Sequence, residues 1–316
     1  MRIYFTSDIH GSDKCWQKFL RCGEFYEADV LIVGGDITGK FMVPIVTEPD
    51  GSVTCLFHGV QHAVRNDDDL VDVKRRIAWA GSYALEVTRE EHDRYEQDPD
   101  AVARVFNDLV RERVERWMAM ADERLSAGSV ECYVSGGNDD EPEIDEILNG
   151  AARVVCPEGR VVRVGDQFEM AGLGFANQTP WNCPRDISEE ELARRIAELA
   201  AQVQDVESAI FDFHVPPYDS GIDTAPRLTD ELQIVNNAGG EPDFIPVGSV
   251  AVRNAIDTYQ PLLGIHGHIH ESQGIRQLGR TTVVNPGSEY QEGILNGVLI
   301  DLDRRSGIKR AQLVSG

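Results

Sequence analysis

The chain has 316 residues, of which 41% are hydrophobic, so it is long enough to bury a sizeable core in one large or two ordinary domains. Its 30 Lys and Arg residues stand against 54 Asp and Glu residues, and the resulting net charge of −24 argues against extended nucleic acid as a partner. No apolar run approaches the roughly 20 residues of a membrane span, and no secretory signal is visible, so we expect a soluble protein with no membrane partner.

The amino-terminal segment predicts alternating strands and helices. Residues 2–7 and 30–33 are β-rich apolar runs, and a helix capped by Ser12 is expected near 12–22. About 90 residues then separate Asp36 from the next such strand at 130–134, far more than the few residues that usually join neighbouring elements. The intervening segment is therefore predicted to be an insertion.

The insertion is predicted to open with a hairpin and to continue as two helices. Residues 45–56 have strand-like flanks around a Pro-Asp-Gly turn. Helices near 68–96 and 102–125 follow, with Asp98-Pro99-Asp100 between them. We expect a helical hairpin over one rim of the functional site; the alternative is a segment that only adds buried surface. The domain division is then a core of residues 1–40 and 129–316 and a cap of residues 41–128.

The part beyond residue 150 continues the α/β pattern. Residues 160–164 and 168–174 predict adjacent strands, and Ser188-Glu-Glu-Glu191 is a capping box that opens a helix. A helix near 249–259 and strands at 281–284 and 297–302 complete the fold. The six cysteines are irregularly spaced without a C-x-x-C pair, which predicts reduced and mostly buried thiols in a cytoplasmic protein.

Side chains that commonly bind metals follow five apolar runs that predict strands, at residues 2–7, 30–33, 130–134, 209–213 and 262–265. They are in Asp8-Ile-His10, Gly35-Asp36, Gly137-Asn138-Asp139, His214 and Gly267-His268-Ile-His270. Each motif alone is common in turns, but the carboxyl ends of strands in α/β sheets are where ligands collect. Two divalent ions about 3.5–4 Å apart need one bridging carboxylate, with imidazole, amide and carboxylate groups on either side. That mixture is present, so the sequence indicates a two-metal site. No G-x-S-x-G motif supports a serine nucleophile instead.

In this order, the motifs resemble those of the calcineurin-like metallophosphoesterases, and Asn285-Pro-Gly-Ser288 extends the likeness over nearly the whole chain. The segments His214-Val-Pro-Pro217 and His266–Ser272 are most similar to a prokaryotic branch related to cyclic-nucleotide phosphodiesterases. The resemblance implies an α/β fold, namely a four-layer αββα sandwich that carries the helical-hairpin cap as an insertion.

The same resemblance implies which residues bind metal. Asp8, His10, Asp36 and His270 would hold one ion, and Asp36, Asn138, His214 and His268 would hold the other, so that Asp36 is the bridge. Four neutral imidazoles suit transition metals better than Mg or Ca, so we expect Mn or Fe, with Zn, Co and Ni also compatible. A hydroxide between the two ions would attack phosphorus in line with the leaving oxygen.

The third motif departs from the family pattern, because Asp139 follows Asn138 where many members have a His that steadies the transition state and protonates the leaving group. Asn138 and Asp139 are the catalytic candidates. Asp139 would act as an acid only if burial or Asp140 raised its pKa; otherwise His58, His62 or a water would supply the proton. Alkyl monoesters should suffer most from this departure.

Two further loops are expected to reach the substrate. Asn177, with Thr179 and Trp181, follows one strand, and Tyr218 follows His214-Val-Pro-Pro217. Together these features favour a phosphodiesterase that acts on a small or nucleotide-like phosphate ester. The alternatives are a phosphomonoesterase or pyrophosphohydrolase, and a catalytically weak scaffold of the same fold.

Overall fold

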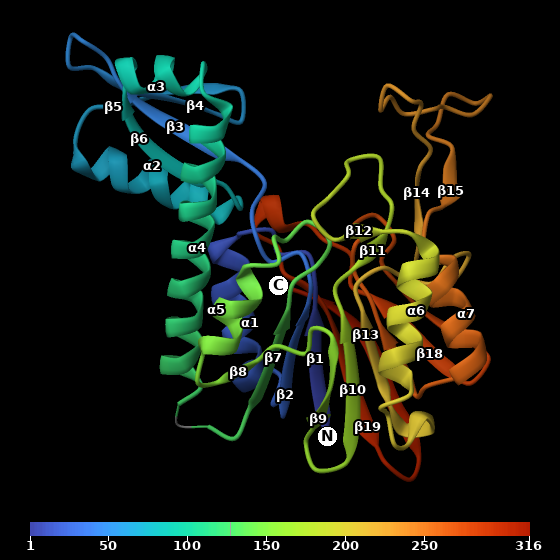
Figure 1. Ribbon diagram of the computed structural model, residues 1–316. Helices are drawn as coiled ribbons and strands as arrows, with labels where there is room; N and C mark the ends of the chain where they lie inside the picture. Colours follow the sequence, from blue (N-terminus) through green and yellow to red (C-terminus); the bar gives the residue numbers. More distant parts are fainter. Residues whose placement is uncertain (127) are drawn as a thin grey trace.

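The computed structural model describes residues 1–126 and 128–316 and contains two six-stranded sheets that pack face to face (Figure 1). The first sheet has the order β20-β19-β1-β2-β7-β8, with bounds β1 Arg2–Thr6, β2 Val30–Gly34, β7 Glu131–Ser135, β8 Val154–Val155, β19 Asn296–Asp303 and β20 Gly307–Ser315. The second has the order β17-β18-β16-β13-β10-β9, with bounds β9 Arg160–Val164, β10 Phe168–Leu173, β13 Ile210–Phe213, β16 Leu263–Ile265, β17 Gly274–Leu278 and β18 Thr281–Asn285.

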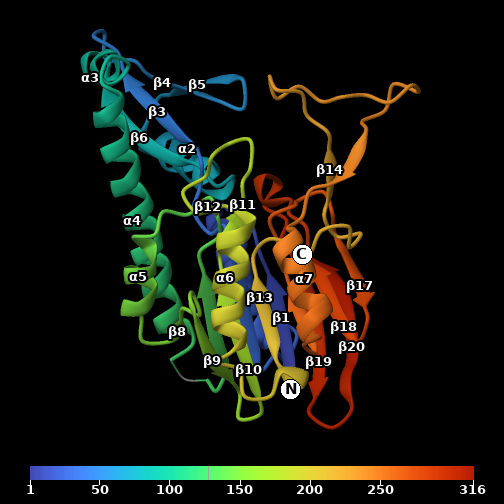
Figure 2. The same ribbon diagram turned by 45° about the vertical axis from the view of Figure 1, so that its right-hand side comes forward.

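Helices cover the outer face of each sheet, which gives four layers (Figures 1 and 2). On the first sheet lie α1 Asp13–Phe25, α4 Pro99–Arg124 and α5 Ile144–Gly150, and on the second lie α6 Glu189–Ala200 and α7 Val250–Tyr259. The layers follow from the alternation of side chains along each strand. In β1, Ile3 and Phe5 enter the apolar cluster between the sheets, while Tyr4 packs on the side that the helices cover. The predicted αββα sandwich is confirmed.

The insertion differs from the predicted helical hairpin. Strands β3 Met42–Thr47, β4 Val53–Phe57, β5 Val60–Val64 and β6 Tyr83–Thr88 form a four-stranded sheet, with α2 Asp67–Trp79 and α3 Arg89–Tyr95 beside it. The β3–β4 hairpin was predicted correctly, but the single helix over 68–96 was wrong. Gly81, at φ 85°, follows the end of α2, and the next residues pair in parallel with β3 as β6.

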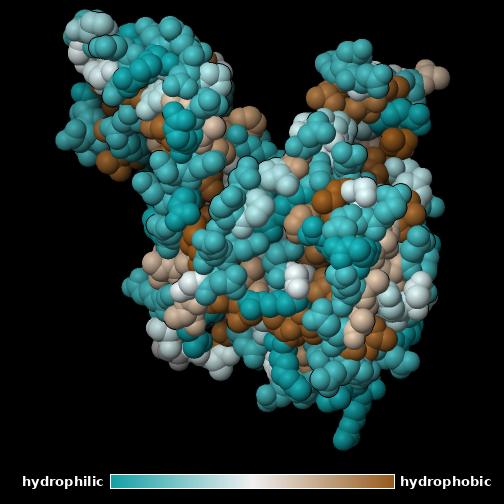
Figure 3. Space-filling view, in the orientation of Figure 1, coloured by the Kyte–Doolittle hydropathy of each residue, from teal (hydrophilic) through white to brown (hydrophobic). Residues whose placement is uncertain are grey.

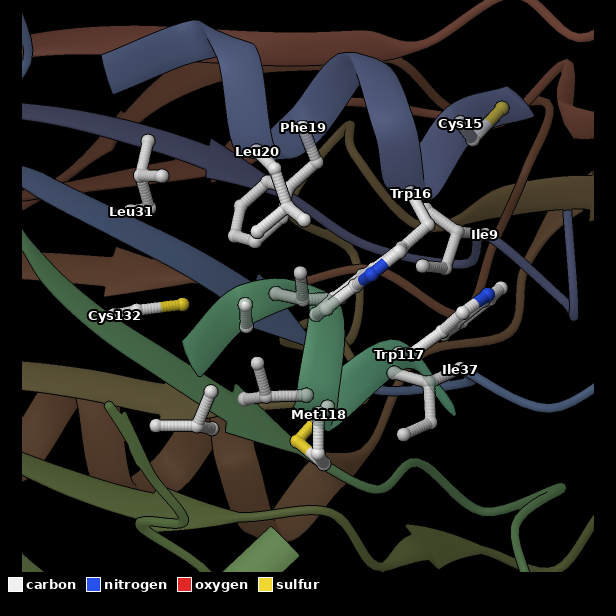
Figure 4. Close-up of a cluster of buried hydrophobic side chains, with 14 of the residues drawn as sticks. Ile9, Cys15, Trp16, Phe19, Leu20, Leu31, Ile37, Trp117, Met118 and Cys132 are labelled. Carbon is white, nitrogen blue, oxygen red and sulfur yellow. The ribbon is translucent and has the colours of Figure 1, made fainter. Parts of the chain in front are cut away.

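Helix α4 links this cap to the core. It begins in the cap after Asp98, whose side chain caps it, and runs down beside α1 (Figure 1). Its second half is buried in the core of the first sheet, where Trp117 stacks on Trp16 with ring centroids 4.9 Å apart (Figure 4). The second predicted helix is therefore present, and its second half packs against α1 and α5 of the core. The division at residue 128 stays a prediction.

A second projection stands opposite the cap. Its base is formed by β14 Thr224–Pro226 and β15 Phe244–Pro246, which pair antiparallel, and we call residues 224–246 the arm (Figure 2). The strands of both sheets end between the cap and the arm, and Figure 3 shows a hollow between these two lobes. Two short strands, β11 Ala176–Asn177 and β12 Asp186–Ile187, pair nearby. No helix among the described residues is long and apolar enough to cross a membrane.

Candidate metal centre

The loops that follow β1, β2, β7, β13 and β16 bring the seven predicted ligands together. Strands β1, β2 and β7 are parallel neighbours in one sheet, and β13 and β16 are parallel neighbours in the other. Their carboxyl ends therefore meet where the edges of the two sheets face each other. The ligand loops converge there because the topology brings together strand ends that are far apart in the sequence.

One group of possible ligands consists of Asp8, His10 and His270, whose ligand atoms lie within 4.8 Å of one another. The Nε2 atoms of His10 and His270 are 3.0 Å apart, and His270 Nε2 is 3.5 Å from Asp8 Oδ1. Ligands about 2.0–2.2 Å from a shared ion lie at separations of this size from one another. These three side chains can therefore surround one cation.

A second group consists of Asp36, His214 and His268, again with ligand atoms within 4.8 Å. His214 Nε2 is 3.3 Å from Asp36 Oδ1. The other oxygen of Asp36, Oδ2, lies 3.6 Å from His10 Nε2 in the first group. Asp36 thus presents one carboxylate oxygen to each group, which is the arrangement required of a bridging ligand.

Several buried atoms in this centre have no hydrogen-bond partner among the described residues. His214 Nε2 has none, although its Nδ1 lies 2.8 Å from the Gly34 carbonyl, which fixes the ring and leaves Nε2 available to bind a metal. Asn138 donates from Nδ2 to Asp186 Oδ1 at 2.9 Å, while its Oδ1 also has no partner. Leaving such atoms unsatisfied costs about 1–3 kcal/mol each. A cation would satisfy them, so the residues present fit a metal pair.

The electrostatics of the centre depend on burial. Burial lowers the pKa of His268 to about 3 and that of His10 well below its ordinary value, so both imidazoles are neutral and ready to bind metal. Burial also raises the pKa of Asp36 to about 6. For His214, burial lowers the pKa, but the Asp36 and Asp8 carboxylates and the Gly34 carbonyl together outweigh this effect and raise it to about 10.

The ligand loops have unusual backbone geometry. Asp8, Asp36 and His268 have φ values of 55°, 50° and 66°, which is the left-handed region that non-glycine residues rarely adopt. A Cβ at Gly267 would lie 2.0 Å from Ser7 Oγ and 2.3 Å from Asp8 Oδ2, so only glycine fits beside this ligand. Such strain is concentrated at functional sites, where the surrounding fold must enforce it.

Asp139 is held between two loops at the edge of the centre. Its Oδ2 contacts Lys40 Nζ, its Oδ1 accepts a 2.7 Å hydrogen bond from Cys183 Sγ, and its backbone N–H donates to Asp36 Oδ1 at 3.1 Å. Burial alone would raise the pKa of Asp139, but the Lys40 ammonium, the Cys183 hydrogen bond and His10 together outweigh it and hold the pKa below its ordinary value. The condition under which Asp139 would serve as an acid, a raised pKa, is not met.

Asp140 has a structural role instead of tuning its neighbour. Its buried carboxylate accepts hydrogen bonds from the backbone N–H groups of Ile37, Thr38 and Gly137, at 3.0, 2.8 and 2.7 Å. These bonds join the loop that follows β2 to the loop that follows β7. Asp140 therefore fixes the two loops that carry Asp36 and Asn138.

The predicted substrate residues lie at different distances from this centre. Asn177 is in β11, which pairs with β12, the strand that carries the Asn138 partner Asp186. Tyr218 is 41% exposed in the loop that follows β13. His58 and His62 lie in the β4–β5 hairpin of the cap, and neither has a hydrogen bond or ion pair to a predicted ligand within the described part of the chain. The structure therefore gives no support for these two histidines as the acid.

The sequence did not reveal three residues that shape the centre: Lys40, Arg185 and Asp186. Asp186 accepts hydrogen bonds from Asn138, Thr179 and Cys183, so it ties the 177–186 loop to a predicted ligand. Arg185, only 1% exposed, donates to the carbonyls of Asp140 and Glu141. Lys40 lies four residues after Asp36, and this closeness to a predicted ligand was the feature of the sequence that could have indicated its place beside the centre.

Comparison with known proteins supports the fold. No protein-family model matches the chain. The uncharacterized protein MJ1162 of Methanocaldococcus jannaschii is 29% identical over 152 residues, which are 48% of this chain and 61% of that relative, so the match spans less than two thirds of the relative. One solved structure matches with a TM-score of 0.59 at 14% identity, covering 99% of this chain and 98% of the other. TT1561 of Thermus thermophilus matches with a TM-score of 0.53 at 17% identity, covering 100% of this chain and 97% of the other.

Proposed function

We propose that this chain, which combines the four-layer fold with the ligand motifs in the order typical of calcineurin-like metallophosphoesterases, is a metal-dependent phosphoesterase of that kind. We further propose that its substrate is a phosphodiester of small or nucleotide-like size. The observation that carries the proposal is the Asp36 carboxylate, whose two oxygens face two separate groups of buried ligands.

The residues would divide between two divalent transition ions, for which manganese and iron are our first candidates. Asp8, His10 and His270 would hold one ion, His214 and His268 the other, and Asp36 would bridge them. The buried Oδ1 of Asn138, which has no hydrogen-bond partner among the described residues, would complete the second group. Such a pair lowers the pKa of water and offsets charge on a phosphoryl group. The protein contributes the orientation, since Gly34 fixes the His214 ring and Asp186 fixes the Asn138 amide.

The preference for a diester rests on position 139, where Asp139 stands in place of the histidine that protonates the leaving group in many members of the family that the motifs resemble. Alkyl monoesters, which have poor leaving groups, should suffer most from this difference. The net charge of −24 further favours a small substrate over extended nucleic acid.

Exposed aromatic side chains support a substrate with a planar organic group. Trp181 is 63% exposed in the 177–186 loop, and its backbone N–H donates to Thr179 Oγ1. Phe41 is 61% exposed in the residue after Lys40. Bases and aryl groups stack on such side chains with a gain of about 1–3 kcal/mol each.

A cytoplasmic location remains a prediction from the cysteine pattern alone.

The test is turnover by purified protein after removal of metal and addition of Mn²⁺ or Fe²⁺. Bis(4-nitrophenyl) phosphate, a cyclic nucleotide and 4-nitrophenyl phosphate should be compared, and we expect metal-dependent hydrolysis with the diesters faster. Faster hydrolysis of the monoester would assign the phosphatase alternative. Absence of turnover on all three, together with a stable protein partner and no bound ion, would favour the scaffold alternative.

A further inference from the structure

Lys40 occupies the point where the chain leaves the core for the cap. It lies four residues after Asp36 and one before the exposed Phe41, and its Nζ contacts Asp139 Oδ2. The Lys40 side chain is 40% exposed, whereas that of Asp139 is 16% exposed. The ammonium group therefore lies on the open side of a carboxylate that belongs to the metal centre.

Asp139 fixes Lys40 in relation to the metal ligands. Asp139 Oδ2 is 4.0 Å from His10 Nδ1, its backbone N–H donates to Asp36, and Cys183 donates to its other oxygen. Because Asp139 is held from three directions, the ammonium it binds has a defined position beside the bridging ligand.

Space for a ligand exists next to this ammonium. A cavity of about 190 Å³ is lined by Lys40, by the two acidic residues Asp139 and Glu141, and by Phe106, Asn107 and Val110 of α4. An ammonium has three N–H donors, and Asp139 is the acceptor recorded for Lys40 in the described part of the chain. Donors therefore remain for an anionic group that enters from the open side.

We propose that Lys40 is a catalytic residue whose ammonium binds the phosphate ester and stabilises negative charge on the leaving oxygen. The inference rests on the proposed phosphoesterase function and deepens it. In the reaction, a new bond forms between phosphorus and the oxygen of water, and the bond from phosphorus to the leaving oxygen breaks. The electron pair of the broken bond goes to the leaving oxygen, where Lys40 donates a hydrogen bond, and the leaving group takes its proton from water.

This assignment explains the carboxylate at position 139. A residue at this position need not itself be the acid if its role is to hold a cation in place. The proposal also predicts a dependence on the leaving group, because a poorer leaving group carries more charge in the transition state. If Lys40 were only a counter-ion of Asp139, no such dependence would arise.

The test compares Lys40→Met and Lys40→Arg with the control Lys74→Met. Lys74 is a matched control because it is 39% exposed and pairs with a single carboxylate, Glu86, in the cap. The substrates are methyl 4-nitrophenyl phosphate and methyl phenyl phosphate, with the Mn²⁺-loaded protein. For Lys40→Met we expect kcat to fall about 10-fold on the nitrophenyl ester and about 100-fold or more on the phenyl ester, within the range for loss of one electrostatic donor. Lys40→Arg should recover much of the loss, and Lys74→Met should match the unmutated protein.

A second readout does not depend on turnover. Inorganic phosphate binding, measured by calorimetry on the Mn²⁺-loaded proteins, should weaken by about 10-fold in Lys40→Met because one charged donor is lost, with equal metal content in all variants. Equal losses on the two esters combined with unchanged phosphate binding would overturn the assignment of Lys40, as would loss of metal from Lys40→Met. If the unmutated protein hydrolyses neither ester, the proposed function fails, and the phosphate measurement alone then decides whether Lys40 binds the anion.

Discussion

Trp117 provides a test of whether the insertion is part of the core. Its side chain is 0% exposed, its ring lies nearly parallel to that of Trp16 with an interplanar angle of 6°, and its Nε1 donates to Asp13 Oδ1 at 2.7 Å. Figure 4 shows the two indoles among apolar side chains of α1, α4 and nearby loops. Trp117→Ala would remove all of these contacts from a helix that begins in the cap.

The expected loss of stability follows from the buried area. A Trp side chain buries roughly 200 Å² of mostly apolar surface, which at about 25 cal/mol per Å² corresponds to about 5 kcal/mol. The hydrogen bond to the Asp13 carboxylate adds about 1.5–3 kcal/mol, and relaxation of the site and regained side-chain entropy subtract from the sum. We expect Trp117→Ala to lower the free energy of unfolding by about 4 kcal/mol, within the usual range for buried Trp.

The measurement is urea unfolding followed by far-UV circular dichroism. Trp117→Phe keeps most of the packing and should cost about 2 kcal/mol, while Trp181→Ala, at a Trp that is 63% exposed, should change stability by less than about 0.5 kcal/mol. A cost below about 1.5 kcal/mol for Trp117→Ala would refute the reasoning, because it would fall under the range for a buried Trp. So would a separate early transition of the cap that leaves the rest of the protein unchanged.

Three further predictions concern the metal centre and its support. Asp36→Asn should release bound metal, measured by mass spectrometry, and lower turnover by at least about 100-fold; retention of two ions would contradict the bridging assignment. Asp186→Ala frees the amide of Asn138 and should weaken metal affinity about 10–100-fold, whereas exposed Asp166→Ala should have no effect. Burial between the sheets raises the pKa of Asp212 from 3.8 to about 7, so the folded state holds a proton that the unfolded state has lost between these values. The free energy of unfolding should therefore fall as pH rises from about 4 to 7, relative to that of Asp212→Asn. The upper limit of the fall is about 4 kcal/mol, at about 1.36 kcal/mol per pKa unit. Parallel pH profiles of the two proteins in urea unfolding would contradict this expectation.

The metal-centre motifs could be predicted from the sequence because each depends on local chemistry. A predicted ligand such as Asp36 follows a short apolar strand, and neighbouring parallel strands have their carboxyl ends at the same edge of a sheet. The αββα sandwich followed from the same strands together with the resemblance. Neither inference required knowledge of contacts between distant side chains.

Other features depend on distant contacts and could not be predicted in this way. The apolar stripe through residues 70–87 fits a helix, but Gly81 and parallel pairing with β3 turn its last part into β6. The arm contains isolated β-bridges, such as that between Leu228 and Ile234, and no periodic pattern of apolar residues in the sequence predicts them. The contact of Lys40 with Asp139 joins residues that are far apart in the sequence, so the environment of Asp139 was known only from the fold.

The cap and the metal centre are joined by more than the chain connection. Arg113 of α4 is 8% exposed and donates to the carbonyl of Gly11, next to His10, and to that of Ser82 in the cap at 3.0 Å. Lys40, the last residue before the insertion, contacts Asp139, which follows the proposed ligand Asn138. The insertion therefore contacts the loop that follows β1, and the residue that leads into it contacts the loop that follows β7. A displacement of the cap relative to the core would have to break the hydrogen bonds of Arg113 or the contact of Lys40 with Asp139.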